Sequence, residues 1–124
     1  MYLIDTNIII YHLSNSIPQP AHRKIREIFK RHFNISVITK MEVLGFRKHT
    51  DASYSTAQQF LGYAKVLELN EPIVEMVIAL RRAHKTKLPD AIIAATALRH
   101  DFTLVTRNTH DFDGIGLRTY NPFA

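Results

Sequence analysis

The chain contains no cysteine, which excludes disulfide bonds, thiolate zinc sites and a cysteine nucleophile. Glycine and proline are scarce as well, with four and five residues among 124, so collagen-like and low-complexity classes do not fit. A hydrophobic fraction of 46% is enough for one buried core. We therefore expect a single domain over residues 1–124.

Long hydrophobic runs are absent too. The apolar N-terminal segment MYLIDTNIII is interrupted by Asp5 and Asn7 and has no cationic leader, so it resembles neither a signal peptide nor a membrane span. The lack of cysteine is compatible with a reducing compartment. Together these features predict a cytoplasmic protein with no membrane contact.

Basic residues outnumber acidic ones by 16 to 11, which gives a formal net charge of +5. This excess attracts polyanions but does not identify one. The basic residues are densest between Arg23 and Arg31, beside the apolar stripe Ala21, Ile25 and Ile28 of a predicted amphipathic helix. That basic face is either a solvated surface or a track for RNA, and the sequence leaves both interpretations open.

Hydrophobic periodicity predicts strands and helices in alternation. We expect strands at residues 2–4, 35–38, 66–69, 102–106 and 117–120. Helices are expected at residues 8–13, 20–33, 39–48 and 57–64, followed by two that begin at Pro72 and at Pro89-Asp90. Strands separated by helices predict an α/β sandwich whose central sheet is mainly parallel and has four or five strands.

Four acidic residues occupy positions where this sheet would place them at one edge. Asp5 directly follows the first predicted strand, Glu42 lies four residues after the second, and Asp111 follows the strand at 102–106. Asp90 opens the helix AIIAATAL, which is apolar on nearly every side. Open parallel sheets bind ligands beyond the carboxyl ends of their strands, so we expect the four carboxylates to converge there.

Each acid also has an ordinary structural explanation. Asp5 and Asp90 are suited to cap the helices that follow them, Thr39-x-x-Glu42 fits a capping box, and Asp111 lies in a polar turn. Taken together, four clustered carboxylates would repel by up to about 4 kcal/mol per close pair at an effective dielectric of 20. A hard divalent cation such as Mg²⁺ would offset this repulsion.

A carboxylate-held Mg²⁺ on a basic protein suits hydrolysis of a phosphodiester, because the metal can activate water and stabilise charge in the transition state. Zinc is a poorer fit, since none of the seven histidines shows H-x-x-x-H spacing. Basic side chains at the rim would hold the flanking phosphates.

Four ordered segments between residue 2 and about Gly116 resemble the motifs of PIN domains, and more narrowly those of VapC-type toxins of bacterial toxin-antitoxin pairs. They are Leu3-Ile4-Asp5-Thr6-Asn7, Ile38-Thr39-x-x-Glu42, Leu88-Pro89-Asp90-Ala91-Ile92-Ile93-Ala94-Ala95 and Leu104-Val105-Thr106-Arg107-Asn108-x-x-Asp111-Phe112. The resemblance implies a Rossmann-like three-layer sandwich and an endoribonuclease that depends on Mg²⁺ or Mn²⁺. It also implies a homodimer and a VapB-like antitoxin whose tail blocks the acidic site.

The resemblance assigns roles by position. Its catalytic acids are Asp5, Glu42, Asp90 and Asp111, with Asp5 and Asp90 as the direct metal ligands. The supporting polar residues are Thr6, Asn7, Thr106 and Asn108, and Arg107 is a substrate or rim contact. Asp113 lies two residues beyond Asp111 and could exchange roles with it, whereas Asp101 is expected at the opposite edge of the sheet.

Three other functions compete with this prediction. A haloacid-dehalogenase-like phosphatase needs a second Asp two residues after the first, where this chain has Asn7. A two-component receiver usually has a Lys after a late strand, where Thr106-Arg107-Asn108 stands. The more serious rival is a non-catalytic RNA-binding or regulatory PIN module, because an intact set of acids is necessary for cleavage but not sufficient.

Overall fold

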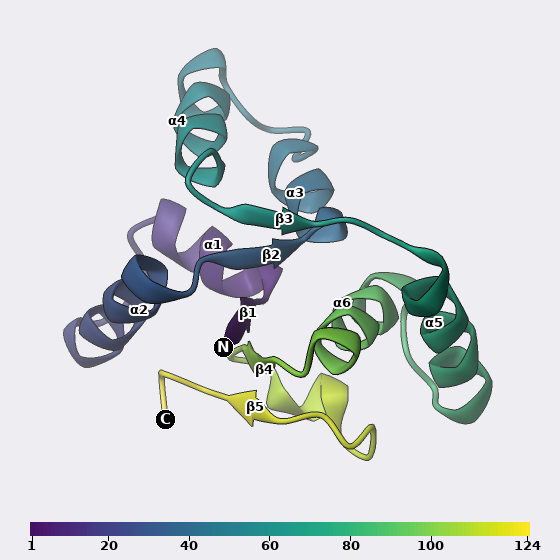
Figure 1. Ribbon diagram of the computed structural model, residues 1–124. Helices are drawn as coiled ribbons and strands as arrows, with labels where there is room; N and C mark the ends of the chain where they lie inside the picture. The colour runs from purple at the N-terminus through teal and green to yellow at the C-terminus, as the bar shows by residue number, and fades with distance from the viewer.

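The computed structural model describes all residues 1–124, and strands alternate with helices along the chain (Figure 1). The strands are β1 Tyr2–Ile4, β2 Asn34–Ser36, β3 Lys65–Leu67, β4 Thr103–Val105 and β5 Thr119–Tyr120. The α-helices are α1 Thr6–Leu13, α2 Gln19–Arg31, α3 Val37–Leu44, α4 Asp51–Leu61, α5 Glu71–Ala83 and α6 Leu88–His100. A short 3-10 helix, η1, covers Thr109–Phe112.

All strand pairs in the sheet are parallel, and the strand order is β3-β2-β1-β4-β5. Strands β2 and β3 lie on one side of β1, and β4 lies on its other side. In such sheets a crevice opens between the two central strands at their carboxyl ends. The predicted parallel α/β sandwich is confirmed, and the strand order reverses direction between β1 and β4.

Helices cover both faces of the sheet because successive side chains of a strand point to opposite faces. Leu3 and Leu104 pack into one core with α5 and α6. Their neighbours Ile4 and Val105 pack into a second core with α1, α2 and α4. Figure 1 shows α1 and α2 on one side of the strands and α5 and α6 on the other. The result is a three-layer sandwich.

Helix α6 is the sealed helix that the sequence predicts, since every residue from Ala91 to Ala97 is buried. It begins earlier than predicted, with Lys87 as N-cap and Leu88 as its first residue. The expectation that Asp90 caps this helix is therefore wrong. Asp90 instead occupies the third helical position, where a carboxylate still interacts favourably with the helix dipole.

The boundary between the second strand and the third helix also differs from the prediction. Val37 and Ile38 belong to α3 and not to the strand, because the Ser36 side chain accepts a hydrogen bond from the Ile38 backbone N–H at 3.2 Å and caps the helix. The predicted capping box of Thr39 and Glu42 is therefore wrong. Both residues lie inside α3, and their side chains are free for other contacts.

Smaller differences concern element ends. The third helix stops at Leu44, before Gly45, and not near Lys48. The fourth helix covers Asp51–Leu61 and not residues 57–64, and Thr50 and Ser53 form a reciprocal capping box at its start. No helix of the structure is both long and apolar enough to span a bilayer.

Candidate active site

The Asp5 carboxylate is built into the junction between β1 and α1. Its backbone is extended, its Oδ1 accepts the Thr6 backbone N–H at 2.7 Å, and only 5% of the residue is exposed. The structural role predicted for Asp5 as an N-cap is therefore confirmed. This role uses one carboxylate oxygen and leaves Oδ2 for other contacts.

Two polar side chains hold Asp5 Oδ2. The Thr106 hydroxyl donates to it at 2.7 Å and the Asn7 side-chain amide at 3.1 Å. The Thr106 hydroxyl in turn accepts the backbone N–H of Asn108 at 3.1 Å. A buried acid held by three donors has a fixed orientation, and these donors belong to Thr6, Asn7 and Thr106.

Glu42 reaches the same region from α3. The Thr6 hydroxyl donates to Glu42 Oε1 at 2.8 Å and lies 3.0 Å from the Thr39 hydroxyl, which is fully buried. Thr6 thus connects the two acids, since its backbone N–H binds Asp5 and its side chain binds Glu42. Thr39 is a contact that the sequence analysis did not assign to the site.

The acids influence one another electrostatically. Burial raises the pKa of the Asp5 carboxyl to about 6; the hydrogen bonds from Thr106 and Thr6 oppose this shift, and the charges of Asp90 and Glu42 add to it. Burial also raises the pKa of Asp90, with further contributions from Asp111 and Glu42, while Lys87 acts in the opposite direction. None of these four acids forms an ion pair with a basic side chain.

Asp90 and Asp111 line one pocket of about 250 Å³ together with Asp113. Its other walls include four basic or titratable side chains: His84, Lys85, Lys87 and His110. Asp113 lies 3.4 Å from the His110 ring nitrogen, whereas it is the charge of Asp111 that acts on Asp90. The pocket thus holds Asp111 and Asp113 together beside Asp90.

The donor set suits a hard divalent cation. It consists of carboxylate oxygens that repel one another and have no cationic partner, which is the chemistry that Mg²⁺ and Mn²⁺ offset. No three His, Asp or Glu side chains stand close enough in this structure to coordinate one ion together. Mg²⁺ commonly keeps several waters and uses one or two carboxylates directly, so a complete cage is not needed for these residues to fit it.

Comparison with known proteins agrees with this geometry. The family model described as PIN domain matches residues 2–116. The chain belongs to the PIN-domain family. PIN-domain toxins are in general nucleases.

Individual proteins similar to this PIN domain include a bacterial toxin and chains from toxin-antitoxin complexes. Toxin FitB of Neisseria gonorrhoeae is 29% identical over 142 aligned residues, which cover 99% of both chains. A chain of a toxin-antitoxin complex from Klebsiella pneumoniae is 36% identical with a TM-score of 0.82, covering 99% of this chain and 98% of that one. A chain of DNA-bound VapBC from Salmonella typhimurium is 25% identical with a TM-score of 0.84, covering 98% and 97%. The predicted resemblance to VapC-type toxins is thereby confirmed.

The remaining predicted residues lie around this centre. The exposed Arg107 follows Thr106, and its backbone N–H points to Asn7 Oδ1 at 3.3 Å. Asn108 contributes a backbone N–H to Thr106, while no hydrogen bond of its side chain is found. Asp101 caps the far end of α6 and pairs with Arg118 at 2.9 Å, so its predicted place away from the acids of this PIN domain is correct.

Two features were not predicted from the sequence: the basic side chains that line the Asp90 pocket and the contact of Phe123 with Arg107. Lys85 and Lys87 lie close to Asp90 in the sequence, just before the apolar helix α6. This short spacing could have indicated basic side chains near that acid. Phe123 gave no such signal. It lies near the C-terminus and contacts Arg107 only because β5 runs beside β4.

Proposed function

We propose that this PIN domain is an Mg²⁺- or Mn²⁺-dependent endoribonuclease and the toxin of a VapBC-type pair in the cytoplasm. The observation that carries the proposal is the environment of Asp5, a buried carboxylate whose pKa is raised to about 6. The nearby charges of Asp90 and Glu42 further disfavour its ionised form. Keeping this buried carboxylate ionised at neutral pH costs free energy, so a function for its charge is the better explanation.

In this proposal Asp5 and Asp90 hold the ion directly, and Glu42 and Asp111 orient water or substrate beside it. The bound metal would supply an activated water and would neutralise charge on the phosphate under attack. Thr106, Asn7 and Thr6 keep the Asp5 and Glu42 carboxylates oriented through the hydrogen bonds that they donate. Fixed carboxylates need no reorganisation during the reaction.

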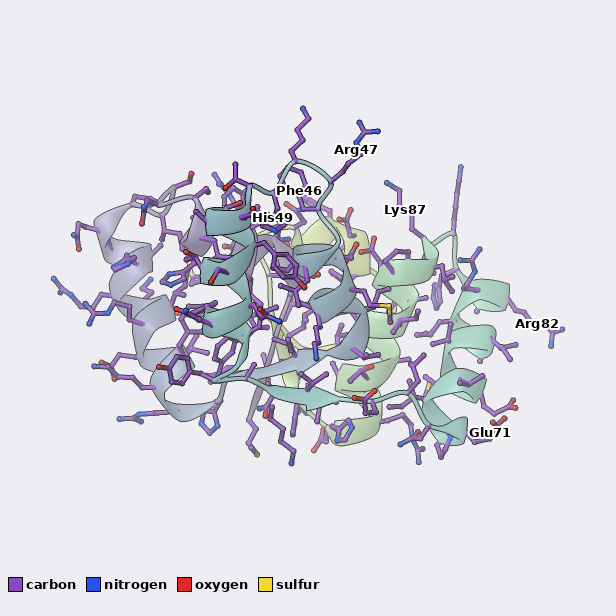
Figure 2. All side chains as sticks on the ribbon, turned by 90° about the horizontal axis from the view of Figure 1, so that it is seen from above. Phe46, Arg47, His49, Glu71, Arg82 and Lys87 are labelled. Carbon is purple, nitrogen blue, oxygen red and sulfur yellow. The ribbon has the colours of Figure 1, made fainter.

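Basic side chains around the acids would hold the phosphates of RNA on either side of the cleaved bond. Lys85 and Lys87 line the pocket that contains Asp90 and Asp111. Figure 2 shows Arg47 and Lys87 extending from the same side of the molecule. Such contacts would weaken as salt is added, because phosphate binding releases counterions.

A second pocket, of about 420 Å³, supports an antitoxin partner. It lies between α1, α3 and α4, and its lining includes Ile10, Leu13, Phe46 and also Glu42. Figure 2 shows Phe46 and His49 together beside the α3 and α4 ends. A bound antitoxin segment would fill this apolar pocket and reach the acids through Glu42. The similar chain from Klebsiella pneumoniae comes from a toxin-antitoxin complex.

Apolar residues on another surface support the proposed homodimer. Val74 and Ile78, one turn apart on α5, are 36% and 49% exposed, and Leu69 before α5 and Leu88 at the start of α6 are 42% and 50% exposed. Exposed apolar residues grouped on one side of a small protein often mark a subunit contact.

Cleavage of RNA by the purified, antitoxin-free protein tests the proposal. Cellular RNA should be cut in millimolar Mg²⁺ or Mn²⁺ and remain intact with a chelator, and Asp90→Asn should abolish cutting. The Glu75→Gln variant, in which an exposed acid of α5 loses its charge, should cut like the wild type. A wild-type protein that cuts no RNA with either metal would contradict the proposal.

The second candidate is a non-catalytic RNA-binding module. It is favoured by one observation, namely that no three potential ligands form a closed metal cage. The same experiment separates the two functions when RNA binding is measured beside cleavage. Binding without cleavage in the wild type, at verified metal content, would favour the module.

A further inference from the structure

Arg107 is held against two aromatic rings at the rim of the acidic site. Its guanidinium carbon lies 5.1 Å from the centre of the Tyr11 ring and 4.6 Å from that of Phe123. The two rings meet edge to face, with centres 5.6 Å apart and an angle of 61° between their planes. Cation–π contacts of this kind restrain a side chain that would otherwise move freely in solvent.

The C-terminal residues are themselves anchored to the segment that carries Arg107. The Asn121 side-chain amide donates to the Arg107 carbonyl at 3.5 Å, and the Phe123 backbone N–H donates to Asn121 Oδ1 at 2.9 Å. Pro122 between them is buried. The chain end therefore places the Phe123 ring against Arg107.

The same residue is connected to the acids on its other side. Its backbone N–H points to Asn7 Oδ1 at 3.3 Å, and Asn7 donates to Asp5 Oδ2 at 3.1 Å. Arg107 is thus separated from Asp5 by one side chain. Its position is set both by the chain end and by the hydrogen bonds around Asp5.

The guanidinium has no acidic partner. Arg107 forms none of the ion pairs in the structure, and its hydrogen bonds involve only its backbone. The guanidinium carbon lies over both rings, and no hydrogen bond within the protein uses the guanidinium N–H groups. A planar set of free N–H donors matches two oxygens of a phosphate.

We propose that Tyr11 and Phe123 are positioning residues that pre-organise Arg107 to bind an RNA phosphate beside the acidic site. This inference rests on the proposed function, because it takes RNA as the substrate. Holding the side chain in advance lowers the conformational entropy lost on binding. Arg107 is then the substrate contact, and the chain end acts through it.

RNA binding in an inactive background tests this inference. The probe is a short fluorescein-labelled single-stranded RNA, and the parent protein is Asp90→Asn, with anisotropy measured over a series of salt concentrations. Arg107→Ala should weaken binding by about ten-fold and lower the slope of log K against log salt by about 0.7, the value for one lost phosphate contact. Arg99→Ala removes a charge from the last turn of α6 and is the matched control.

The rings are tested by substitutions at Phe123. Phe123→Leu keeps an apolar side chain but removes the ring, and it should weaken binding about two- to five-fold while the salt slope stays unchanged. Phe123→Tyr restores a ring and should restore the affinity. Tyr63→Ala, which removes an 84% exposed tyrosine elsewhere, should leave binding unchanged. Melting curves of all variants show that each is folded.

The outcomes distinguish this inference from the function on which it rests. If the parent binds RNA but Arg107→Ala behaves like Arg99→Ala, the inference is overturned and the proposed function stands. The same follows if Phe123→Leu binds as tightly as Phe123→Tyr. If the parent binds no RNA at all, the proposed function falls and the inference falls with it.

Discussion

The Thr106 hydroxyl donates a hydrogen bond to Asp5 Oδ2 at 2.7 Å, although 101 positions separate the two residues in the chain. The contact follows from strand register. Ile4 of β1 is paired with Val105 of β4 in the parallel sheet, so the residues that follow each strand emerge side by side. The centre of the candidate site is therefore a direct product of the crossover that puts β4 beside β1.

Replacing Thr106 by valine tests this contact. Valine keeps the shape of threonine but cannot donate to Asp5, and the Thr106 hydrogen bond lowers the pKa of that carboxyl. The Thr106→Val variant should therefore need a higher pH for half-maximal RNA cleavage and lose about ten-fold in rate at neutral pH. A pH profile of cleavage measures both effects.

Thr96→Val provides a matched control. Thr96 is also fully buried, but its hydroxyl donates to the Ile92 carbonyl inside α6 at 2.7 Å, outside the acidic site. This variant should keep the acidic limb of the profile unchanged. Equal profiles for Thr106→Val and the wild type would show that the hydrogen bond does not matter for Asp5.

Asp5 should make folding stability depend on pH in a defined window. Its pKa is raised from 3.8 to about 6 in the folded protein, so the folded state binds this proton more tightly than the unfolded state. Its contribution to stability is full below about pH 4 and is lost as pH rises to about 6. In the presence of a chelator, the wild type should lose up to about 3 kcal/mol relative to Asp5→Asn across this window.

Chemical denaturation of both proteins at a series of pH values measures this difference. The comparison with Asp5→Asn removes the pH dependence of all other groups, which the two proteins share. A difference that stays constant between pH 4 and pH 7, within about 0.5 kcal/mol, would contradict the raised pKa.

Binding of metal should stabilise the fold through the same acids. Millimolar Mg²⁺ or Mn²⁺ should raise the melting temperature of the wild type, because ligand binding to the folded state stabilises it by mass action. Asp90→Asn should show a much smaller rise, and the exposed-acid variant Glu75→Gln should show the full one. A rise of the same size in Asp90→Asn would locate the metal elsewhere.

Ser36→Ala tests the helix start that differs from the sequence prediction. Because the Ser36 side chain caps α3 by accepting the Ile38 N–H, its loss should cost about 1 kcal/mol in the free energy of unfolding. Thermal or urea denaturation measures this change. An unchanged stability would argue that α3 does not depend on this cap.

Much of the fold could be predicted because its signals are local. Apolar segments in the sequence identified the strands and the sealed helix α6. Because strands and helices alternate along the chain, they implied a parallel sheet. The start of α3 could not be predicted from the same signals. Val37 and Ile38 favour a strand by side-chain type, and only the Ser36 cap shows where the helix begins.

The candidate site also has one part that the sequence could predict and one part that it could not. Asp5, Glu42, Asp90 and Asp111 belong to ordered motifs, so their residue types and spacing indicated a shared edge of the sheet. The contact between Arg107 and Phe123 depends on the register of β5 against β4, which no local pattern reveals. The link from Thr6 to Glu42 likewise required the packing of α1 against α3.

Anomalous scattering from crystals grown with Mn²⁺ tests the central claim most directly, because it locates the ion without relying on activity. The account predicts a strong peak within bonding distance of the Asp5 and Asp90 carboxylates in the wild type, and no peak there in Asp90→Asn. A wild-type crystal that shows no peak at these acids, from protein that still cleaves RNA with Mn²⁺, would contradict it.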